Sequence, residues 1–328
     1  MTLGGVGPVV VVGAGVVGLT SAIRLRQHGI GVRIVAREVP PRTTSDVAAA
    51  IWYPYLAYPP ERVLPWSEAT RRTLDAIEDP AAGVSTVRLL ELFDGPAPEP
   101  WWREALPDFG WADGAELPEG YEAAYDVRVP LVDTSVHMRW LMGRAAALGV
   151  AVSRAAVADL DDLFGAAALV VNCAGVDAGP LAGDASVTPI RGQVVRLAPV
   201  NGVRTALVDE AGPLGLTYII PRPRDIVVGG TADAGAWNAE PDPAVASAIL
   251  ARACVLEPRL AGARVLGHAV GLRPGRPTVR LELERRLSGP VIHNYGHGGS
   301  GFTLAWGCAD DVTALAADVL GAPAEPAD

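Results

Sequence analysis

Three glycines near the N-terminus, Gly13, Gly15 and Gly18, form a G-x-G-x-x-G motif directly after an apolar run over residues 8–12. The β-branched run predicts a buried parallel strand, and residues 16–28 predict a helix. Between a strand and a helix, the first glycine permits a tight turn, the second lets the backbone approach a pyrophosphate, and the third lets the two elements pack closely. The helix start also offers free N–H groups to phosphates. The motif therefore predicts a dinucleotide site at the start of an α/β fold.

The next strand, predicted over residues 31–36, ends beside a charged pair, Arg37 and Glu38. An acid at this point of a dinucleotide-binding unit binds the adenosine ribose, which suits Glu38. Arg37 would instead suit the 2′-phosphate of NADP, and the two side chains would also form an ordinary exposed pair. The motif alone leaves FAD and NAD(P) open.

The composition of the chain excludes several classes of protein. Its 328 residues favour two packed domains, because single cores rarely grow beyond about 300 residues. All 27 basic residues are arginine, so neither the lysine of pyridoxal-phosphate enzymes nor that of a P-loop is present. The net charge of −10 and the lack of a basic stripe argue against nucleic acid as a partner.

The cysteines and the apolar N-terminus bear on the cellular setting. Cys173, Cys254 and Cys308 are far apart and form no metal or redox motif, which favours a reducing, cytoplasmic setting. The apolar stretch over residues 6–23 contains a proline and four glycines, so we expect a strand, a turn and a helix rather than a membrane span. Symmetric dimers are the commonest assemblies, so a homodimer is the default expectation.

Helix and strand signals place further elements along the chain. Four prolines over residues 52–65 predict a loop, and Thr134 and Ser135 predict the cap of a helix that runs to Leu148. Residues 193–232 alternate between turn signals and predict antiparallel strands. The remaining predictions are N-cap residues over 43–46 before an alanine-rich run, helices over 67–77, 243–256 and 303–320, and strands over 150–152, 168–171 and 291–294. The nucleotide-binding pieces thus come from both ends and the middle of the chain, with a second domain inserted between them.

Four later segments carry distinctive motifs: TTSDVAAAIW at residues 43–52, YIIPR at 218–222 followed by GGT at 229–231, GLRP at 271–274, and HNYGHGGSGFT at 293–303. Together with the glycine motif they span nearly the whole chain. In the same order, they resemble the D-amino acid oxidase family, which is related to the D-aspartate and glycine oxidases. Five matching segments are far more specific than the glycine motif alone.

The resemblance implies a fold and a cofactor. The cofactor is non-covalently bound FAD. The fold class is α/β, with a Rossmann-like FAD-binding domain and an inserted α+β substrate domain that contains a mixed sheet. We assign residues 1–55, 134–192 and 280–328 to the FAD-binding domain, and residues 56–133 and 193–279 to the substrate-binding domain.

The resemblance also implies the contacts of the site. Arg273 and Tyr218 would bind the substrate carboxylate, the Gly299 carbonyl would bind the amine, and Tyr55 is a further predicted substrate contact. Arg273 suits this role chemically, because a guanidinium presents a planar fork that matches a carboxylate. The residues predicted to contact FAD are Gly13, Ala14, Gly15, Val16, Val17, Gly18, Arg37, Glu38, Thr43, Thr44, Ser45, Ala49, Ala50, Gly298, Gly299, Ser300, Gly301, Phe302 and Thr303.

The implied reaction is oxidative deamination. A hydride moves from the substrate Cα to flavin N5, O₂ is reduced to H₂O₂, and the imino acid is hydrolysed to a 2-oxo acid and ammonia. No catalytic acid–base residue is expected, because the cofactor supplies the difficult step. No metal site is expected either, since His293 and His297 lie in a glycine-rich loop with no acid nearby.

The chain departs from the family pattern at two places. Leu214 stands where vertebrate members carry a tyrosine, and the loop over residues 206–217 is shorter, which puts product release limited by a mobile lid in doubt. Arg37 stands in place of the usual aspartate, so the ribose contact is expected to move to Glu38.

The substrate class follows from what surrounds the predicted pocket. Residues 53–56 lack the histidine of the oxidases that act on acidic substrates, and no arginine follows Thr231. Asp233 would repel a second carboxylate if it faced the pocket, so neutral D-amino acids are favoured, whereas Arg222 would undermine this if it entered the pocket. The alternatives are D-aspartate oxidase or glycine oxidase-like activity, an NAD(P)-dependent reductase, and a non-catalytic flavin-binding protein.

Overall fold

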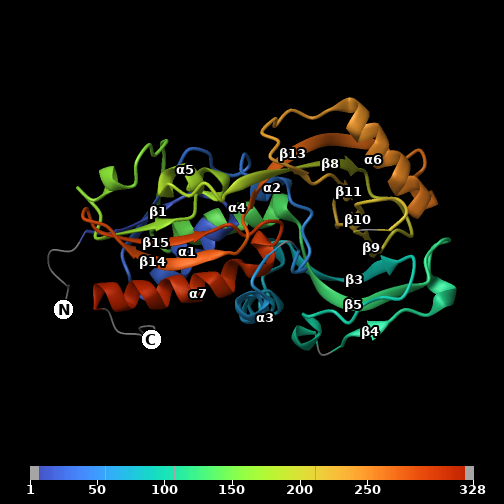
Figure 1. Ribbon diagram of the computed structural model, residues 1–328, viewed down its shortest axis with the longest axis horizontal. Coiled ribbons are helices and arrows are strands. Elements are labelled where there is room, and N and C mark those ends of the chain that lie inside the picture. Colours follow the sequence, from blue (N-terminus) through green and yellow to red (C-terminus); the bar gives the residue numbers. More distant parts are fainter. Residues whose placement is uncertain (1–6, 56, 107, 211, 322–328) are drawn as a thin grey trace.

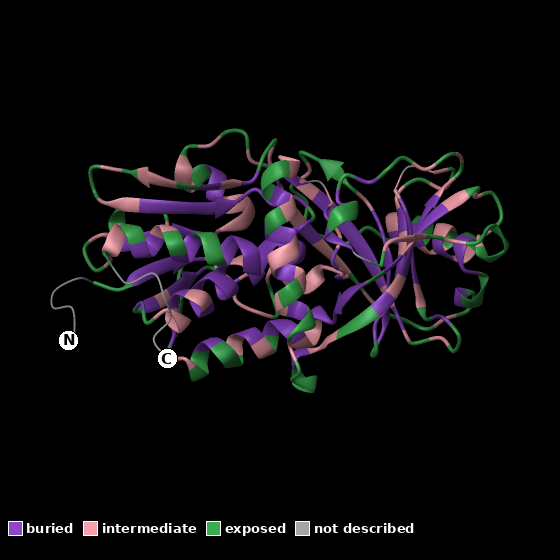
Figure 2. Ribbon diagram, turned by 90° about the horizontal axis from the view of Figure 1, so that it is seen from below, coloured by how far each residue is buried: buried purple, intermediate pink, exposed green. Residues whose placement is uncertain are grey.

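The molecule contains two β-sheets that lie next to each other along its long axis (Figure 1). The computed structural model describes residues 7–55, 57–106, 108–210 and 212–321. Buried residues run along the strands of both sheets and along the inward faces of the helices (Figure 2). The predicted domain segments extend at both chain ends into residues outside this description, and their boundaries stay a prediction.

The first sheet has six strands in the order β14-β15-β7-β1-β2-β6. All neighbours are parallel except β14 and β15, which form an antiparallel pair. The two central strands β1 and β7 are buried along their whole length, as expected for strands covered on both faces. The six strands are β1 (Val9–Val12), β2 (Val32–Ala36), β6 (Ala151–Arg154), β7 (Leu169–Asn172), β14 (Arg280–Arg285) and β15 (Pro290–Tyr295).

Helices from both ends of the chain pack together on the first sheet. The first helix contacts the last one, and the last helix also contacts α3 (Figure 1). The α-helices are α1 (Val16–Gln27), α2 (Thr44–Val47), α3 (Pro60–Asp75), α4 (Thr134–Ala147), α5 (Ala178–Ala182), α6 (Pro243–Leu256) and α7 (Gly301–Leu320). Short 3₁₀ helices cover Pro80–Ala82, Arg103–Ala105, Gly114–Glu116, Asp161–Leu163, Gly175–Asp177 and Pro258–Leu260.

The second sheet has nine strands in the order β12-β8-β11-β10-β9-β3-β5-β4, with β13 paired to β8. Its neighbours are antiparallel except for β3 and β9, so the sheet is mixed. Helix α6 packs against β8, β10 and β11. The strands are β3 (Val84–Phe93), β4 (Gly110–Trp111), β5 (Ala123–Val132), β8 (Thr188–Leu197), β9 (Thr205–Asp209), β10 (Thr217–Pro221), β11 (Ile226–Gly229), β12 (Asp233–Ala234) and β13 (Val265–Gly275).

Most predicted elements are confirmed within a few residues. The predicted helix over residues 243–256 coincides with α6, and those over 16–28 and 303–320 correspond to α1 and α7. The short strand predicted from residue 150 pairs with β2 in the first sheet. The antiparallel strands predicted over 193–232 are present as β8, β10 and β11, together with β9. The α/β class with a mixed second sheet is therefore confirmed.

Three local predictions are wrong. The proline-rich loop over residues 52–65 ends early, because α3 already begins at Pro60. Proline is favoured in the first helical turn, where its missing N–H has no helical partner to lose. Pro65 does lie inside the helix and costs a hydrogen bond, but the burial of Val63 and Trp66 holds the helix in place.

The other two errors concern a cap and a loop. The N-cap of α4 is Asp133, whose carboxylate accepts the Ser135 N–H, rather than the hydroxyl residues that follow it. Residues 206–209 of the predicted short loop continue strand β9, so only residues 210–216 connect β9 to β10.

Candidate active site

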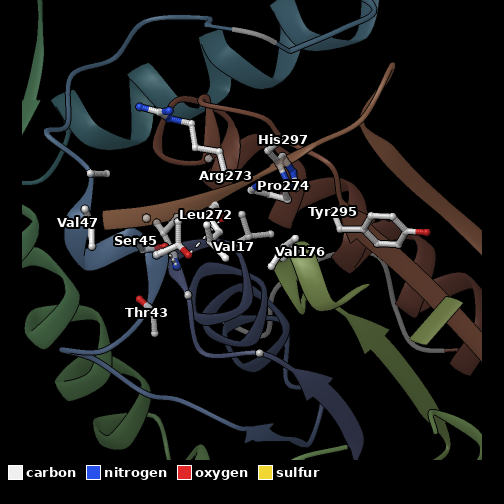
Figure 3. Close-up of a pocket in the computed structure, with 18 of the residues that line it drawn as sticks. Val17, Thr43, Ser45, Val47, Val176, Leu272, Arg273, Pro274, Tyr295 and His297 are labelled. Carbon is white, nitrogen blue, oxygen red and sulfur yellow. Dashed lines mark hydrogen bonds between the residues drawn. The ribbon is translucent and has the colours of Figure 1, made fainter. Parts of the chain in front are cut away.

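A cavity of about 750 Å³ lies between the two sheets and runs from the start of α1 to Arg273. Figure 3 shows Ser45, Val17 and Leu272 gathered at the start of α1, with Arg273 projecting from the opposite side of its strand. The volume lies within the range of pockets that hold small molecules and cofactors. The ends of β1, β2 and β7 in the first sheet and of β10 and β13 in the second supply lining residues.

The glycine motif forms one end of this cavity. Gly13 has a φ of +112°, a conformation that side chains rarely adopt, and a Cβ there would collide with the Cys173 carbonyl. A Cβ on Gly18 would collide with the Gly13 carbonyl, so this glycine lets the helix and the strand approach. Gly15 is the N-cap of α1, and the adjacent Val16 N–H donates to the Ser45 hydroxyl over 3.0 Å. The helix start thus faces the cavity with backbone donors, as phosphate binding requires.

The charged pair after β2 lies at the rim of the same end. Arg37 forms an ion pair of 2.6 Å with Asp177, and Glu38 receives 2.8 and 3.0 Å hydrogen bonds from Arg154. Both Arg37 and Glu38 line the cavity. A cationic Arg37 that is neutralised by Asp177 is a poor receptor for a 2′-phosphate.

Most of the predicted FAD contacts line the cavity, but three do not. Those that line it are Gly13, Ala14, Gly15, Val16, Val17, Arg37, Glu38, Thr43, Thr44, Ser45, Ala49, Ala50, Gly298, Gly299, Gly301 and Phe302. Gly18, Ser300 and Thr303 lie behind the lining. The Ser300 hydroxyl donates to the Tyr55 carbonyl over 2.6 Å, and the Thr303 hydroxyl donates to the Tyr53 carbonyl over 2.8 Å. These two residues therefore fix the segment that carries Tyr53 and Tyr55.

Two buried polar atoms test whether the cavity fits a flavin. The His297 Nε2 and the Asn294 Oδ1 have no hydrogen-bond partner among the described residues, and both residues line the cavity. Burial lowers the pKa of His297 to about 4, so the ring is uncharged at neutral pH and keeps one donor and one acceptor nitrogen. Unpaired buried polar atoms are costly, and a polar heterocycle with donors and acceptors would satisfy them. The residues present therefore fit a bound FAD.

The other end of the cavity holds the predicted substrate residues. Arg273, Tyr218 and Tyr55 all line it, and the Arg273 Nη1 donates to the Thr231 carbonyl over 2.9 Å. The guanidinium lies against Gly192, where a Cβ would collide with it. Burial raises the pKa values of Tyr55 and Tyr218, and the charge of Arg273 partly opposes both rises. Both hydroxyls therefore stay protonated and can donate hydrogen bonds near the guanidinium.

The predicted amine-binding residue lies next to this group. Gly299 lines the cavity, and a Cβ on it would collide with the Tyr55 ring. The close packing brings the 298–301 loop and Tyr55 together. Arg273, Tyr218, Tyr55 and Gly299 therefore come together from four separate segments of the chain.

Two carboxylates near the cavity were missed by the sequence analysis. Glu210 lines the cavity directly after β9, and burial together with the charge of Glu91 raises its pKa to about 8. Glu91 on β3 is 6% exposed, and burial raises its pKa to about 7, with only partial opposition from the Tyr53 hydroxyl. A signal for Glu91 was present, because an acid inside the apolar run over residues 89–93 is rarely buried without a reason.

Two charged residues that were weighed for substrate selection lie elsewhere. Asp233 is exposed, pairs with Arg191 and does not line the cavity. It therefore cannot repel an acidic substrate in the pocket. Arg222 is buried in an ion pair with Asp225 and donates to the Ala49 carbonyl and the Thr134 hydroxyl. Arg222 therefore ties the β10–β11 hairpin to the segment after α2 and does not enter the cavity.

Neither a metal site nor a membrane-spanning helix is present among the described residues. His293 Nε2 lies 2.6 Å from the Glu284 carboxylate, whereas His297 faces the cavity. In the part of the chain that the structure describes, no group of three or more His, Cys, Asp or Glu side chains could hold a metal ion. Among those same residues, no helix combines the length and hydrophobicity that a bilayer crossing needs.

Comparisons with known proteins agree with this architecture. Residues 8–315 match the family model described as FAD dependent oxidoreductase. The D-amino-acid oxidase of Rubrobacter xylanophilus is 52% identical over 314 residues, which cover 95% of this chain and 96% of that protein. The D-aspartate oxidase of Homo sapiens is 35% identical, with 97% of each chain covered. A glycine oxidase structure from Bacillus cereus shares the fold, with a TM-score of 0.81 at 20% identity over 96% of this chain and 97% of that one.

The family model covers nearly the whole chain, including both sheets and the cavity between them. The chain therefore belongs to the FAD dependent oxidoreductase family.

Proposed function

We propose that this chain is a D-amino acid oxidase that accepts neutral side chains and disfavours acidic ones. The proposal combines the family, the relatives named D-amino-acid oxidase at 52% and 43% identity, and the arrangement of the cavity. Bound FAD would supply the redox chemistry, accepting two electrons from the substrate Cα–N bond and passing them to O₂. The residues of the chain hold and orient the two reactants.

The observation that carries the proposal is the position of Arg273. Its guanidinium lines the same cavity as the start of α1, and no carboxylate of the described residues pairs with it. An unpaired guanidinium in a cavity is a receptor for a planar anion such as a carboxylate. Tyr218 and Tyr55 add hydroxyl donors beside it, so an amino acid carboxylate would find several donors at one place.

The remaining residues complete the proposed orientation of the substrate. With the carboxylate on Arg273 and Tyr218, the amine would be received by the Gly299 carbonyl, which fixes the direction in which the Cα–H points. The start of α1, together with Thr43, Thr44, Ser45 and the 298–302 loop, would hold the cofactor. Glu38, which already binds Arg154, would receive the adenosine ribose.

The preference against acidic side chains rests on Glu210. This acid lines the cavity beside Glu91, and a second substrate carboxylate placed there would find no cation and could stay ionised only while Glu210 keeps its proton. The cavity lining contains no second arginine near Arg273, since Arg222 is held by Asp225. Human D-aspartate oxidase is a relative, so D-aspartate is the substrate against which this preference should be measured.

The test combines spectroscopy with one substitution. Purified protein should absorb near roughly 450 nm, as bound flavin does, and D-alanine should bleach the band under anaerobic conditions. We expect the Arg273→Leu variant to need at least about 30-fold more D-alanine for half-maximal bleaching, because a charge partner is lost. Arg264→Leu, at an exposed arginine before β13, is the matched control. Unchanged substrate affinity in Arg273→Leu would overturn the proposal.

A peroxide assay then defines the substrates. We expect turnover of D-alanine to exceed that of D-aspartate, glycine and the L-isomers. Equal or faster turnover of D-aspartate would contradict the role given to Glu210.

A further inference from the structure

The sheet register places Glu91, Val208 and Tyr218 on one face of the second sheet, and Glu210 lines the cavity directly after the end of β9. Glu91 on β3 pairs with Val208 on β9, and Val208 pairs with Tyr218 on β10. Residues directly opposite each other in a sheet point to the same face, and so do residues two apart along a strand. Glu210 follows Val208 by two positions and lines the cavity together with it. The cavity therefore has an acidic corner, formed by Glu210 at its surface with Glu91 beside it.

The acidic corner has no positive partner of its own. Among the described residues, no arginine or histidine forms an ion pair with Glu210 or Glu91, and the Glu91 Oε2 has no hydrogen-bond partner. The titratable and charged groups that act on or near the corner are Tyr53, Tyr55, Tyr125, Tyr218 and Arg273. Two buried carboxylates without a cation are costly for the protein, so a ligand that brings a positive charge would gain binding energy there.

Glu210, after β9, and Arg273, on β13, line the cavity from different strands. Among the described residues no ion pair joins the two, and the Arg273 Nη1 donates instead to the Thr231 carbonyl. Tyr55 lies within the electrostatic reach of both, because the charge of Arg273 lowers its pKa and that of Glu210 raises it. A molecule with a carboxylate at one end and a cation at the other would match both charges, with Tyr55 between them.

We propose that Glu210 binds a positively charged substrate side chain, so that the enzyme prefers D-amino acids with a terminal ammonium or guanidinium group over neutral ones of the same length. The proposal rests on the proposed function, because it takes the α-carboxylate to be bound by Arg273. A cation bound at Glu210 would favour the ionised form of that side chain, and Glu91 lies behind it as a second acid that the same cation would attract. An ammonium or guanidinium donates charge-assisted hydrogen bonds to a carboxylate, and these are about twice as strong as hydrogen bonds between neutral groups.

Binding of two carboxylates that cannot be oxidised tests the subsite without turnover. Hexanoate and ε-aminohexanoate lack an α-amine and differ only in the terminal ammonium, so calorimetric titration of the FAD-loaded enzyme isolates the contribution of that charge. We expect ε-aminohexanoate to bind more tightly than hexanoate, and Glu210→Gln to reduce the ratio of the two affinities about tenfold. Glu122→Gln, which removes the same charge at an exposed position, should leave the ratio as in the wild type.

Turnover provides the second measurement. The values of kcat/KM for D-ornithine, D-lysine and D-arginine are compared with those for D-norvaline and D-norleucine in the wild type, Glu210→Gln, Glu91→Gln and Glu122→Gln. We expect at least one cationic substrate to exceed its neutral counterpart in the wild type and to lose about tenfold relative to it in Glu210→Gln. Glu91→Gln should give a smaller loss in the same direction.

The outcomes separate this inference from the proposed function. If D-norleucine reduces the flavin but both ratios stay within twofold of the wild type in Glu210→Gln, the cation subsite is wrong and the oxidase proposal stands. If no D-amino acid reduces the flavin, both proposals fail. Thermal unfolding and flavin content of Glu210→Gln confirm that the variant is folded, and the isosteric amide keeps the shape of the side chain.

Discussion

The two ends of the cavity are built by different means. The cofactor end is shaped mainly by the backbone: Gly13 makes the turn, Gly18 allows close packing, and the start of α1 supplies N–H donors. The substrate end is formed by side chains from separate strands, with Arg273 on β13 and Tyr218 on β10. The glycine turn is contiguous in sequence, whereas the group of substrate residues depends on which strands become neighbours.

This difference sets how each end should respond to substitution. The close backbone contacts at the glycine motif leave no room for an added atom, so a methyl group introduced there should reduce FAD binding. The substrate end relies on charge, so it should fail when a partner is removed and should depend on pH. Four substitutions test this contrast, in order of decreasing expected effect.

The largest effect is expected at the ion pair that joins the second sheet to the segment after α2. Asp225 is 1% exposed at its side chain, and although burial would raise its pKa, the hydrogen bonds and charges of Arg222 and Arg196 lower it overall. Asp225→Ala leaves Arg222 buried without its partner, so we expect the free energy of unfolding to fall by about 3–5 kcal/mol in urea denaturation. Asp75→Ala, at an exposed pair with Arg71, should cost under about 0.5 kcal/mol. A loss no greater than in this control would show that the buried pair is not needed.

At the cofactor end, Gly18→Ala should displace the turn between β1 and α1. The new Cβ meets the Gly13 carbonyl, which belongs to rigid backbone, so we expect a stability loss of about 1–3 kcal/mol and loss of most bound FAD. The ratio of flavin to protein absorbance after gel filtration measures this. Gly31→Ala, where a Cβ meets nothing within 4 Å, should retain FAD. A fully loaded Gly18→Ala protein would refute the claim that the backbone controls this end.

Glu91 makes the stability of the substrate end depend on pH. Its pKa is raised to about 7 in the folded protein, so the folded state retains a proton that the unfolded chain has already released. Stability should therefore fall as the pH rises from about 5 to about 8, and Glu91→Gln should remove about 1–3 kcal/mol of this decline.

Urea denaturation at pH 5 and pH 8 measures that decline, with Glu122→Gln as the exposed control. Equal pH profiles for the wild type and Glu91→Gln would show that Glu91 does not titrate in this range.

The smallest effect is expected for Ser45→Ala. It removes the acceptor of the Val16 N–H at the start of α1, which is worth about 1 kcal/mol, so FAD should bind the apoprotein about fivefold more weakly. Ser85→Ala, an exposed serine on β3, is the control for titration calorimetry. Tighter FAD binding in Ser45→Ala would indicate that this hydroxyl competes with the phosphates.

The sequence allowed the cofactor end to be predicted because its constraints are local. A positive φ at Gly13 demands glycine, and the strand and helix on either side were recognisable from hydrophobic periodicity. The first part of α3, residues 60–66, was missed, since four prolines signal a loop more strongly than the buried Val63 and Trp66 signal a helix. Tertiary packing therefore outweighed the low helix propensity of proline in this segment.

The substrate end was predicted only in part, because its geometry depends on strand pairing. Arg273 and Tyr218 were identified from motifs, but nothing local showed that β9 would lie beside β3 in parallel and bring Glu91 to the same corner as Glu210. The pairing of Arg37 with Asp177 was equally hidden, as 140 positions separate the two residues. Side-chain environments of this kind follow from the fold and cannot be read from spacing.

The six-stranded sheet also constrains how the polypeptide emerges from the ribosome. Its strands are contributed by residues 9–36, by 151–172 and finally by 280–295. During synthesis, the edge of β7 that pairs with β15 therefore stays unpaired while more than a hundred further residues are translated. Completion of this layer is consequently a late event, and truncated nascent chains that lack β15 should be the species that chaperones engage.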